Sequence, residues 1–418
     1  MGSLAKLTLW LYKPKIIGIT GSVGKSSTKE AVVTVLSTKF HAWASPGNLN
    51  SQLGLPLAVL GFTKPGGFKK NISSFFDWLG ILLLAFFKVF NFNYPKILIL
   101  EMGTDRPGDI AYLLRLSGPL DAAVITDIGI SHLEFFKNPE DLAKEKLSLL
   151  KGLRKEGAAV LNFDNDKIRE GAKLRSTIYS YGLGSDADIK ATDIQIVQKG
   201  DITGLNFKVH YNGTVVPFFI PNALGKPAVY SALAAAGVGM VFGMNLVSVS
   251  EALSKYTPPA GRLRLIAGVN DSMIIDDTYN AAPSSTIAAL EALSNFAKGR
   301  KLAALGHLAE LGKMSEEGHR QVGRAVIKNN IDKVFLVGDL TNYIKDELEK
   351  NKYKGSVEWF ENSERAAGPI RSNLKAGDTL LVKGSQSARM EKVVRFVMKS
   401  PSQASKLLVR QSGQWLKT

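Results

Sequence analysis

The segment from Gly18 to Thr28 (GITGSVGKSST) contains the residue types that hold the phosphates of a nucleotide. An apolar run precedes it and a helical pattern follows it. The glycines would turn the backbone and point N–H groups at phosphate oxygens, and the helix N-terminus would add a favourable dipole. Lys25 can reach the outer phosphates and the Ser26 hydroxyl can bind Mg²⁺. We predict an ATP or GTP phosphate site formed by Thr20, Gly21, Ser22, Gly24, Lys25, Ser26 and Ser27.

Polar residues also follow apolar runs elsewhere in the chain. Glu101 ends the run ILILE, where a carboxylate has no packing role. Asp277 ends the run MIID in the second half of the chain, and Lys383 ends TLLV. Ligands in open α/β sheets usually bind at the carboxyl ends of strands. These positions are therefore candidate binding positions. Arg262, which follows a break in the pattern, could clamp a phosphate with its guanidinium group.

Strand and helix patterns alternate along most of the chain, which is typical of an α/β protein with mainly parallel sheets. We expect a helix over Ser26–Phe40 and an Ala-rich helix over Ala228–Phe242. The Gly-punctuated alternation in residues 187–220 instead predicts an antiparallel meander. The expected strands are Lys15–Thr20, Ile97–Glu101, Ala122–Thr126, Ala158–Leu161, Met273–Asp277, Lys301–Leu305, Lys333–Val337 and Thr379–Lys383.

The pattern divides the chain into two α/β domains. A short segment, residues 1–14, precedes a central phosphate-loop domain over 15–260, which carries an apolar insertion at 61–94. A second, Rossmann-like α/β domain is expected over 261–400, followed by a basic tail at 401–418. A chain of 418 residues is long enough for two cores of ordinary domain size.

The composition excludes several classes of protein. There is no cysteine, which rules out disulfide frameworks, thiolate metal sites and cysteine nucleophiles, and which favours a reducing compartment. The net charge of +16 favours anionic partners. Leu4–Tyr12 is apolar but too short for a signal peptide and has no cleavage site, so we expect a cytoplasmic protein. The sequence contains no aromatic–basic module of the kind that binds nucleic acid, so we expect no nucleic-acid partner. We also expect the protein to be a monomer.

The insertion at 61–94 fits neither domain pattern. Its apolar run Leu79–Phe87 is too short to span a bilayer. Two readings stay open: an extra helix that packs on the protein, or a helix that lies on an anionic membrane surface. Aromatic and aliphatic residues between Phe75 and Phe90 predict a broad apolar helical face, and Lys69, Lys70 and Lys88 flank it.

The order of motifs resembles the Mur ligase family, and within it the branch that adds D-alanyl-D-alanine. The phosphate loop TGSVGKS matches the family form T-G-S-x-G-K-[ST]. The other matching motifs are GNLNSQLGLP at Gly47–Pro56, LEMGTDRPGDI at Leu100–Ile110, SHLEFF at Ser131–Phe136, GRLR at Gly261–Arg264, IDDTYNAAPSS at Ile275–Ser285, LGHLAELG at Leu305–Gly312 and LVKGSQSARMEKV at Leu381–Val393.

The resemblance implies an ATP- and Mg²⁺-dependent ligase of peptidoglycan synthesis, which activates a UDP-muramoyl-peptide carboxylate and joins it to D-alanyl-D-alanine. It implies Ser26, Glu101 and His132 as metal ligands. Lys146 matches a lysine that the family can carbamylate, which would add an anionic ligand; an ordinary surface lysine is the alternative. The implied catalytic residues are Lys25, His132, Lys146 and Arg262. The implied nucleotide contacts add Asn50 and Asp277 to the phosphate loop, and the implied substrate contacts are Tyr279, Asn280, Lys383, Ser385 and Arg389.

The chain departs from the family pattern at three places. The family begins with a UDP-sugar domain, whereas only residues 1–14 precede the phosphate strand here, so the insertion at 61–94 could take over that function. Pro227 and Ala228 occupy the positions of a His-Asn pair near the adenine, so adenine recognition is expected to differ. His307 replaces an acidic residue. A Mur-type amide ligase with another acid substrate, and a non-catalytic ATP-binding partner, therefore remain alternatives.

Overall fold

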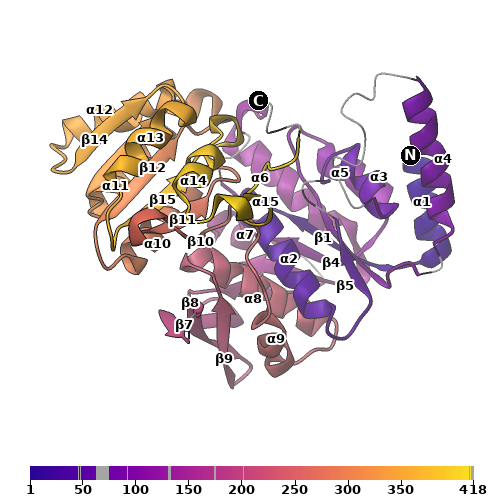
Figure 1. Cartoon of the computed structure of the whole chain (residues 1–418). Coiled ribbons are helices and arrows are strands. Elements are labelled where there is room, and N and C mark those ends of the chain that lie inside the picture. Colours follow the sequence, from indigo (N-terminus) through magenta and orange to yellow (C-terminus); the bar gives the residue numbers. More distant parts are fainter. Residues whose placement is uncertain are drawn as a thin grey trace. The chain divides into compact units, whose positions relative to one another are not determined.

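The structure is a computed structural model of the chain. It describes all residues except 46, 48, 63–74, 92, 130–132, 174–175, 201, 414 and 416–418. The described chain divides into two compact units. The first contains residues 1–194, 206–219 and 229–256, and the second contains residues 195–205, 220–228 and 257–418. Figure 1 shows the order of the elements along the chain.

The first sheet has the strand order β2-β3-β1-β4-β5-β6-β7-β8-β9, and neighbouring strands from β2 to β7 run parallel. The strands are β1 (Lys15–Thr20), β2 (Ala42–Ala44), β3 (Ile97–Glu101), β4 (Leu120–Ile125), β5 (Leu153–Asn162), β6 (Thr177–Gly182), β7 (Ile189–Lys199), β8 (Ile202–Tyr211) and β9 (Thr214–Pro221). The β1 side chains after Lys15 are all buried, as a central strand covered on both faces requires.

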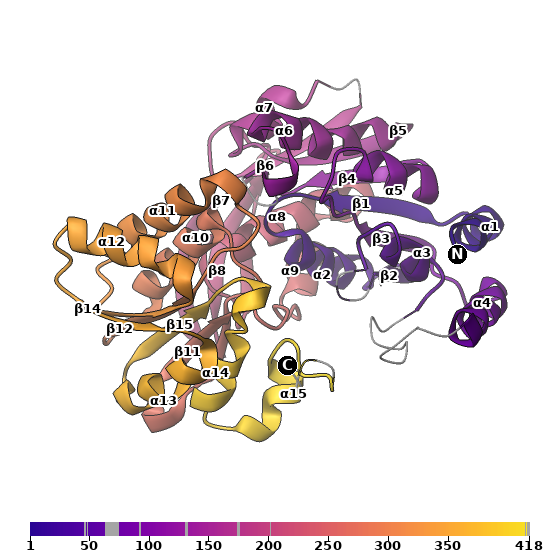
Figure 2. The same cartoon turned by 90° about the horizontal axis from the view of Figure 1, so that it is seen from above.

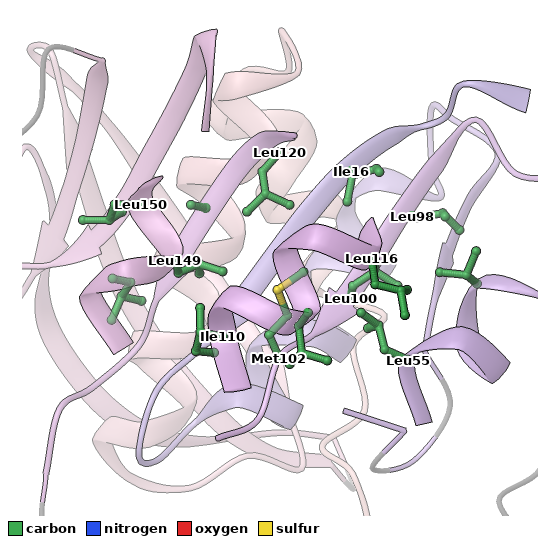
Figure 3. Packing of buried hydrophobic residues seen from close by; sticks show 14 of the residues in the cluster. Ile16, Leu55, Leu98, Leu100, Met102, Ile110, Leu116, Leu120, Leu149 and Leu150 are labelled. Carbon is green, nitrogen blue, oxygen red and sulfur yellow. The ribbon is translucent and has the colours of Figure 1, made fainter. Parts of the chain in front are cut away.

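Helices cover both faces of this sheet, as Figure 2 shows for α5 and α6 over one face and α2, α8 and α9 over the other. The helices are α1 (Gly2–Tyr12), α2 (Lys25–Leu36), α3 (Gly54–Val59), α4 (Phe75–Val89), α5 (Asp109–Ser117), α6 (Pro139–Leu147), α7 (Asp166–Gly171), α8 (Gly225–Val241) and α9 (Leu246–Leu253). Figure 3 shows the core on the α5 side, where Leu98 and Leu100 of β3 pack near Leu55 of α3 and Leu116 of α5. This packing anchors β3, which ends at Glu101.

The second unit contains a sheet of order β10-β11-β15-β12-β13-β14, in which only β10 runs antiparallel to its neighbour. The strands are β10 (Arg264–Ala267), β11 (Met273–Asp277), β12 (Lys301–Gly306), β13 (Lys333–Val337), β14 (Ser356–Phe360) and β15 (Thr379–Lys383). The helices are α10 (Pro283–Phe296), α11 (Ser315–Lys328), α12 (Asn342–Lys350), α13 (Ser363–Asn373), α14 (Glu391–Val397) and α15 (Ala404–Leu407). The α/β prediction is confirmed in both units.

Two segments differ from their expected form. Residues 2–12 form helix α1, whose Ala5 and Thr8 are buried. The chain after Ser400, expected as a basic tail, forms the 3-10 turn Pro401–Gln403 and helix α15, and it buries Ala404 and Leu408 in the core of the second unit. Burial of these two apolar side chains attaches the segment to the second unit.

Among the described residues, no helix is both long enough and apolar enough to cross a bilayer. Helix α4 instead packs along one narrow stripe, in which Ile81, Ala85 and Val89 are buried. Tyr12 of α1 donates a hydrogen bond to the carbonyl oxygen of Val89 (2.9 Å). Packing on the protein, one of the two readings, is therefore present on one side of α4. Among the described side chains of this helix, Leu82, Leu83, Leu84, Phe86 and Phe87 are exposed.

Candidate active site

Three neighbouring parallel strands of the first unit, β3, β1 and β4, end at one edge of the sheet, where β1 leads into the predicted phosphate loop and β3 ends at Glu101. Ile19 of β1 lies beside Glu101 of β3, and Thr20 lies beside Ile125 of β4. Since the carboxyl ends of parallel strands meet at the same edge, the register brings the phosphate loop and the Glu101 carboxylate together.

The phosphate loop between β1 and α2 requires glycine for steric reasons. A Cβ atom at Gly21 would lie 2.0 Å from Thr126 Oγ1, a contact that no side chain can make. Gly24 has φ 88° and precedes the first residue of α2, a conformation that favours glycine. The Lys25 ammonium donates to the carbonyl oxygen of Gly21 (2.6 Å), so it lies over the loop.

The remaining loop residues fix the backbone. The Thr20 hydroxyl is buried and donates to a backbone carbonyl after β3 (2.8 Å). The Ser22 hydroxyl accepts a hydrogen bond from the Gly129 N–H (2.9 Å). The carbonyl oxygen of Ser27 accepts from the Tyr256 hydroxyl (3.3 Å). These bonds hold the loop in one shape, which a phosphate cradle needs if its N–H groups are to converge.

Glu101 is 2% exposed and lies at the centre of a polar cluster. The Ser26 hydroxyl donates to Glu101 Oε2 (3.1 Å), and Asn50 Nδ2 donates to Glu101 Oε1 (3.0 Å). Hydroxyl and carboxylate oxygens are the hard ligands that Mg²⁺ prefers, and Mg²⁺ usually takes only one or two protein ligands beside substrate phosphates. Ser26 and Glu101 thus fit a magnesium site. The described part of the chain contains no group of three or more His, Asp or Glu side chains placed for a metal.

Lys29 is a site residue that the sequence analysis missed. Its ammonium is buried, lies 3.7 Å from Glu101 Oε2, and donates to the carbonyl oxygens of Ser45 (2.6 Å) and Gly47 (2.8 Å). The charge of this buried ammonium attracts the Glu101 carboxylate, and its bonds to the two carbonyl oxygens fix the position from which it does so. Lys29 follows Lys25 by four residues on one helix, a spacing that places both on the same helical face and could have identified it.

Lys146 is fully buried, so an ordinary surface lysine is excluded. Its ammonium donates to the carbonyl oxygen of Gly21 (3.3 Å), which also accepts from Lys25. Burial, and after it the nearby positive charge of Lys25, lowers the pKa of Lys146 to about 7. Burial also raises the pKa of Asp127 above its ordinary value. Two lysines on one carbonyl oxygen create a positive site at the phosphate loop. His132, the third predicted metal ligand, lies outside the described residues.

In the second unit, the predicted residues Asp277 and Lys383 form a buried ion pair at the ends of β11 and β15. Lys383 Nζ lies 2.6 Å from Asp277 Oδ2 and donates to the carbonyl oxygen of Asn280 (3.0 Å). Asp277 Oδ1 accepts from the Leu263 N–H (3.2 Å). The ammonium of Lys383 therefore fixes the loop after β11.

Arg262 stacks on the ring of Tyr279, with its guanidinium carbon 4.1 Å from the ring centroid. Arg262 Nε is one of three buried side-chain polar atoms that lack a hydrogen-bond partner among the described residues. A buried donor without an acceptor is costly, and an anionic ligand would satisfy it. This observation supports the predicted role of Arg262 at a phosphate.

The other predicted substrate residues of this unit already have protein partners. Ser385 is buried, and its hydroxyl accepts from the Ala309 N–H (2.7 Å). Arg389 Nε pairs with Glu391 Oε1 (2.6 Å). His307, which takes the place of the family's acidic residue, shares a hydrogen bond with the Ser387 hydroxyl (2.8 Å).

Comparison with known proteins agrees with this geometry. The family model of the Mur ligase middle domain matches residues 19–239, and the model of the Mur ligase glutamate ligase domain matches residues 261–386. The first of these models alone matches more than half of the chain.

Individual relatives agree as well. The chain is 31% identical to the UDP-N-acetylmuramoyl-tripeptide–D-alanyl-D-alanine ligase of Bacillus subtilis, over 95% of this chain and 79% of that protein. It is 29% identical to the ligase of the same name from Escherichia coli, over 96% and 80%. The crystal structure of MurF ligase from Thermotoga maritima in complex with ADP matches with a TM-score of 0.80 and 26% identity, over 96% and 83%. With both domain models matched in order, the chain belongs to the Mur ligase family.

Proposed function

We propose that the protein is an ATP-dependent amide ligase of peptidoglycan synthesis that joins D-alanyl-D-alanine to a UDP-muramoyl-peptide. The observation that carries this proposal is the Glu101–Ser26 pair (3.1 Å) beside two lysines that converge on the Gly21 carbonyl oxygen. This arrangement suits a magnesium–nucleotide complex. The names of the similar ligases, and the ADP in the structure of the Thermotoga maritima relative, support the substrates.

The reaction has two steps. A carboxylate oxygen of the UDP-muramoyl-peptide attacks the γ-phosphorus of ATP, the bond to the ADP oxygen breaks, and an acyl phosphate forms. The amine nitrogen of D-alanyl-D-alanine then attacks the carbonyl carbon, phosphate leaves with the bonding electron pair, and the nitrogen loses a proton. The products are the amide, ADP and phosphate.

The residues of the chain provide charge and orientation for these steps. Lys25 and the N–H groups of the phosphate loop hold the transferring phosphoryl group. In the second unit, Arg262 offers its unpaired Nε to an anionic group. Ser26 and Glu101 would hold Mg²⁺, with His132 as the further expected ligand. Bound there, Mg²⁺ would neutralise phosphate charge. Lys146 can take up carbon dioxide because its lowered pKa leaves much of the amine neutral, and the resulting carbamate would be an anion at the same site.

The second unit would hold the nucleotide ribose and the dipeptide. We assign the ribose to Asp277, and the dipeptide to the loop of Tyr279 and Asn280 with Ser385 and Arg389. Lys383 positions this loop through Asp277.

A phosphate-release assay tests the function. With UDP-muramoyl-tripeptide and ATP, release should require D-alanyl-D-alanine and should be lost in Lys25→Ala. The control Lys255→Ala removes an exposed lysine from the same unit and should keep the wild-type rate. Release with other acids only would favour a Mur ligase of different substrate, and no release with any acid would favour a non-catalytic ATP-binding protein.

We also propose that the protein works at the cytoplasmic face of the membrane and contacts anionic lipid through α1 and α4, which pack against each other. Among the described residues, nine of the eighteen exposed large apolar side chains lie on or next to these two helices, including Trp10 (68% exposed) and Phe87 (70%). Exposed Lys6 and Lys13 lie on and just after α1, and the net charge is +16. Apolar side chains with nearby lysines are typical of a helix at an anionic lipid surface.

Flotation with anionic vesicles tests this second proposal. The wild-type protein should float, and Trp10→Ser/Phe87→Ser should stay at the bottom of the gradient. The control Val215→Ser/Val247→Ser removes two exposed apolar side chains from other elements and should float like wild type. Equal flotation of all three proteins, or of none, would contradict membrane contact through α1 and α4.

A further inference from the structure

The chain after Ser400 is built into the second unit, although the matching family model ends at residue 386. Ala404 and Leu408 are 4% and 5% exposed and pack in one cluster with residues of α13 and α14. Burial at these two positions anchors the residues that follow. We refer to residues 408–413 and Trp415 as the C-terminal strap.

The strap contacts three segments of this unit that carry proposed site residues: the turn before Arg262, the loop after β11, and the segment of Arg389. Val409 packs on the turn before Arg262, since a Cβ at Gly261 would lie 3.1 Å from Val409 Cγ1. Arg410 donates to the carbonyl oxygens of Thr278 (2.9 Å) and Tyr279, both in the loop after β11.

The end of the strap contacts the third segment, which carries Arg389. The ring of Trp415 lies 5.2 Å from the guanidinium carbon of Arg389, and its carbonyl oxygen accepts from Arg389 Nη2 (2.7 Å). The guanidinium carbon of Arg410 lies 5.9 Å from the same ring.

A buried charge network fixes Arg410 in this position. The Arg410 side chain is 6% exposed and lies 3.0 Å from Glu391 Oε2, and Glu391 is 1% exposed. The other carboxylate oxygen of Glu391 pairs with Arg389 (2.6 Å). Buried ion pairs cost free energy to desolvate unless further hydrogen bonds satisfy the charged groups, and the backbone carbonyls of the β11 loop supply those bonds to Arg410. The planar guanidinium group presents its N–H donors in a rigid fork, here to two carbonyl oxygens and a carboxylate, whereas an ammonium is a point charge on a flexible stem.

The same residues line a cavity of about 670 Å³ that also contains Arg371, Lys392 and Arg395. An anion site is the obvious alternative for this basic surface. However, Arg371 donates to the carbonyl oxygen of Phe396 (2.8 Å), and Lys392 lies 2.6 Å from Glu364. Most of these cations are thus already paired within the protein, which favours a structural frame over a ligand site.

We propose that the C-terminal strap positions the substrate loop of the second unit, with Arg410 as the positioning residue. By holding the carbonyls of Thr278 and Tyr279, Arg410 fixes the direction in which Tyr279 and Asn280 meet the amine substrate. The identity of that substrate rests on the proposed function; the ordering of the loop by Arg410 does not.

Steady-state kinetics of the full chain separates positioning from a purely structural role. Arg410→Ala should raise the KM for D-alanyl-D-alanine roughly 10- to 100-fold, because misplaced contacts weaken productive binding, and should leave the KM for the UDP-muramoyl-peptide unchanged. Arg410→Lys should lie between wild type and Arg410→Ala. The control Arg395→Ala removes an exposed arginine from the same cavity and should behave like wild type. A fall in kcat at an unchanged dipeptide KM would mean that the strap only stabilises the fold, and would overturn the proposal.

Amide hydrogen exchange gives a readout that does not depend on the reaction. The Tyr279 N–H donates to the Gly261 carbonyl oxygen (3.1 Å), and the Leu263 N–H donates to Asp277 Oδ1 (3.2 Å). Both amides should exchange at least several-fold faster in Arg410→Ala than in wild type or Arg395→Ala, while the amides of β13 stay protected. Unchanged exchange of the Tyr279 amide would refute the positioning role of the strap, even if the ligase activity is found. Faster exchange without any ligase activity would refute the proposed function alone.

Discussion

At the residue scale, the Lys29 ammonium lies 3.7 Å from the carboxylate of Glu101, whose proposed role is to hold Mg²⁺ with Ser26. Glu101→Gln should raise the Mg²⁺ concentration needed for phosphate release and lower the rate ~100-fold, since one lost charge contact at a transferring phosphoryl group has about this effect. His132→Ala should act in the same direction. The matched control is Glu30→Gln, because Glu30 also faces Lys29 (3.6 Å) but its side chain is 41% exposed. An unchanged Mg²⁺ titration would remove Glu101 from the metal site.

Lys146 gives a second prediction at this scale. Lys146→Met keeps the volume of the buried side chain but cannot carry a carbamate, so it should be inactive. Lys146→Ala should be inactive as well, and acetate or formate should partly restore its activity if an anion is required at that position. Lys144→Ala, two residues earlier on α6 and with a side chain that is 78% exposed, should keep the wild-type rate. Full activity of both Lys146 variants would refute the carbamate.

At the scale of elements, the loop between β1 and α2 works only if Gly21 lacks a side chain. Gly21→Ala should abolish ATP binding, measured by calorimetry, and should lower the melting temperature because Thr126 must move. Gly80→Ala, in α4, is the control: a Cβ there meets no atom of the described residues within 4 Å, and alanine favours the helix by up to about 1 kcal/mol. Normal ATP affinity in Gly21→Ala would mean that the loop can rearrange at low cost.

The end of β11 contains a buried carboxyl group, that of Asp276, whose pKa is raised. Burial raises the pKa of Asp276 to about 6, above its ordinary value of 3.8. Between these values the folded protein binds a proton that the unfolded chain has lost, so this group contributes less stability as the pH rises through that range. Asp276→Asn does not titrate. The melting temperature of wild type relative to Asp276→Asn should therefore fall between about pH 4 and about pH 7. A constant difference would contradict the raised pKa.

At the scale of the whole molecule, the charge of +16 acts with the apolar surface of α1 and α4. Vesicle binding should weaken when salt is raised from about 0.1 M to about 0.5 M, because the screening length falls below about 10 Å. The loss of binding in Trp10→Ser/Phe87→Ser should persist at both salt concentrations, since burial of apolar area does not depend on screening. Salt-independent binding of wild type would exclude an electrostatic contribution.

The sequence by itself determined the α/β class and most of the strands. The strands β1, β3, β11, β13 and β15 have the predicted bounds, because a parallel strand buried on both faces is a continuous apolar run between polar residues. The short edge strands β2 and β14 were not predicted, since half-buried or mixed residues form them. The phosphate loop and Glu101 were also predicted from the sequence, because each follows or ends an apolar run that forms a strand.

Only the tertiary structure decided which side chains meet. Lys29 and Lys146 are buried at the site because the strands place polar acceptors around them; a lysine in a helical pattern otherwise predicts a solvated face. Arg410 belongs to the second unit because Ala404 and Leu408 are buried, and its partners Thr278 and Glu391 lie far from it in the chain. Contacts between distant segments depend on how the strands are ordered in the sheet, and no local spacing records that order.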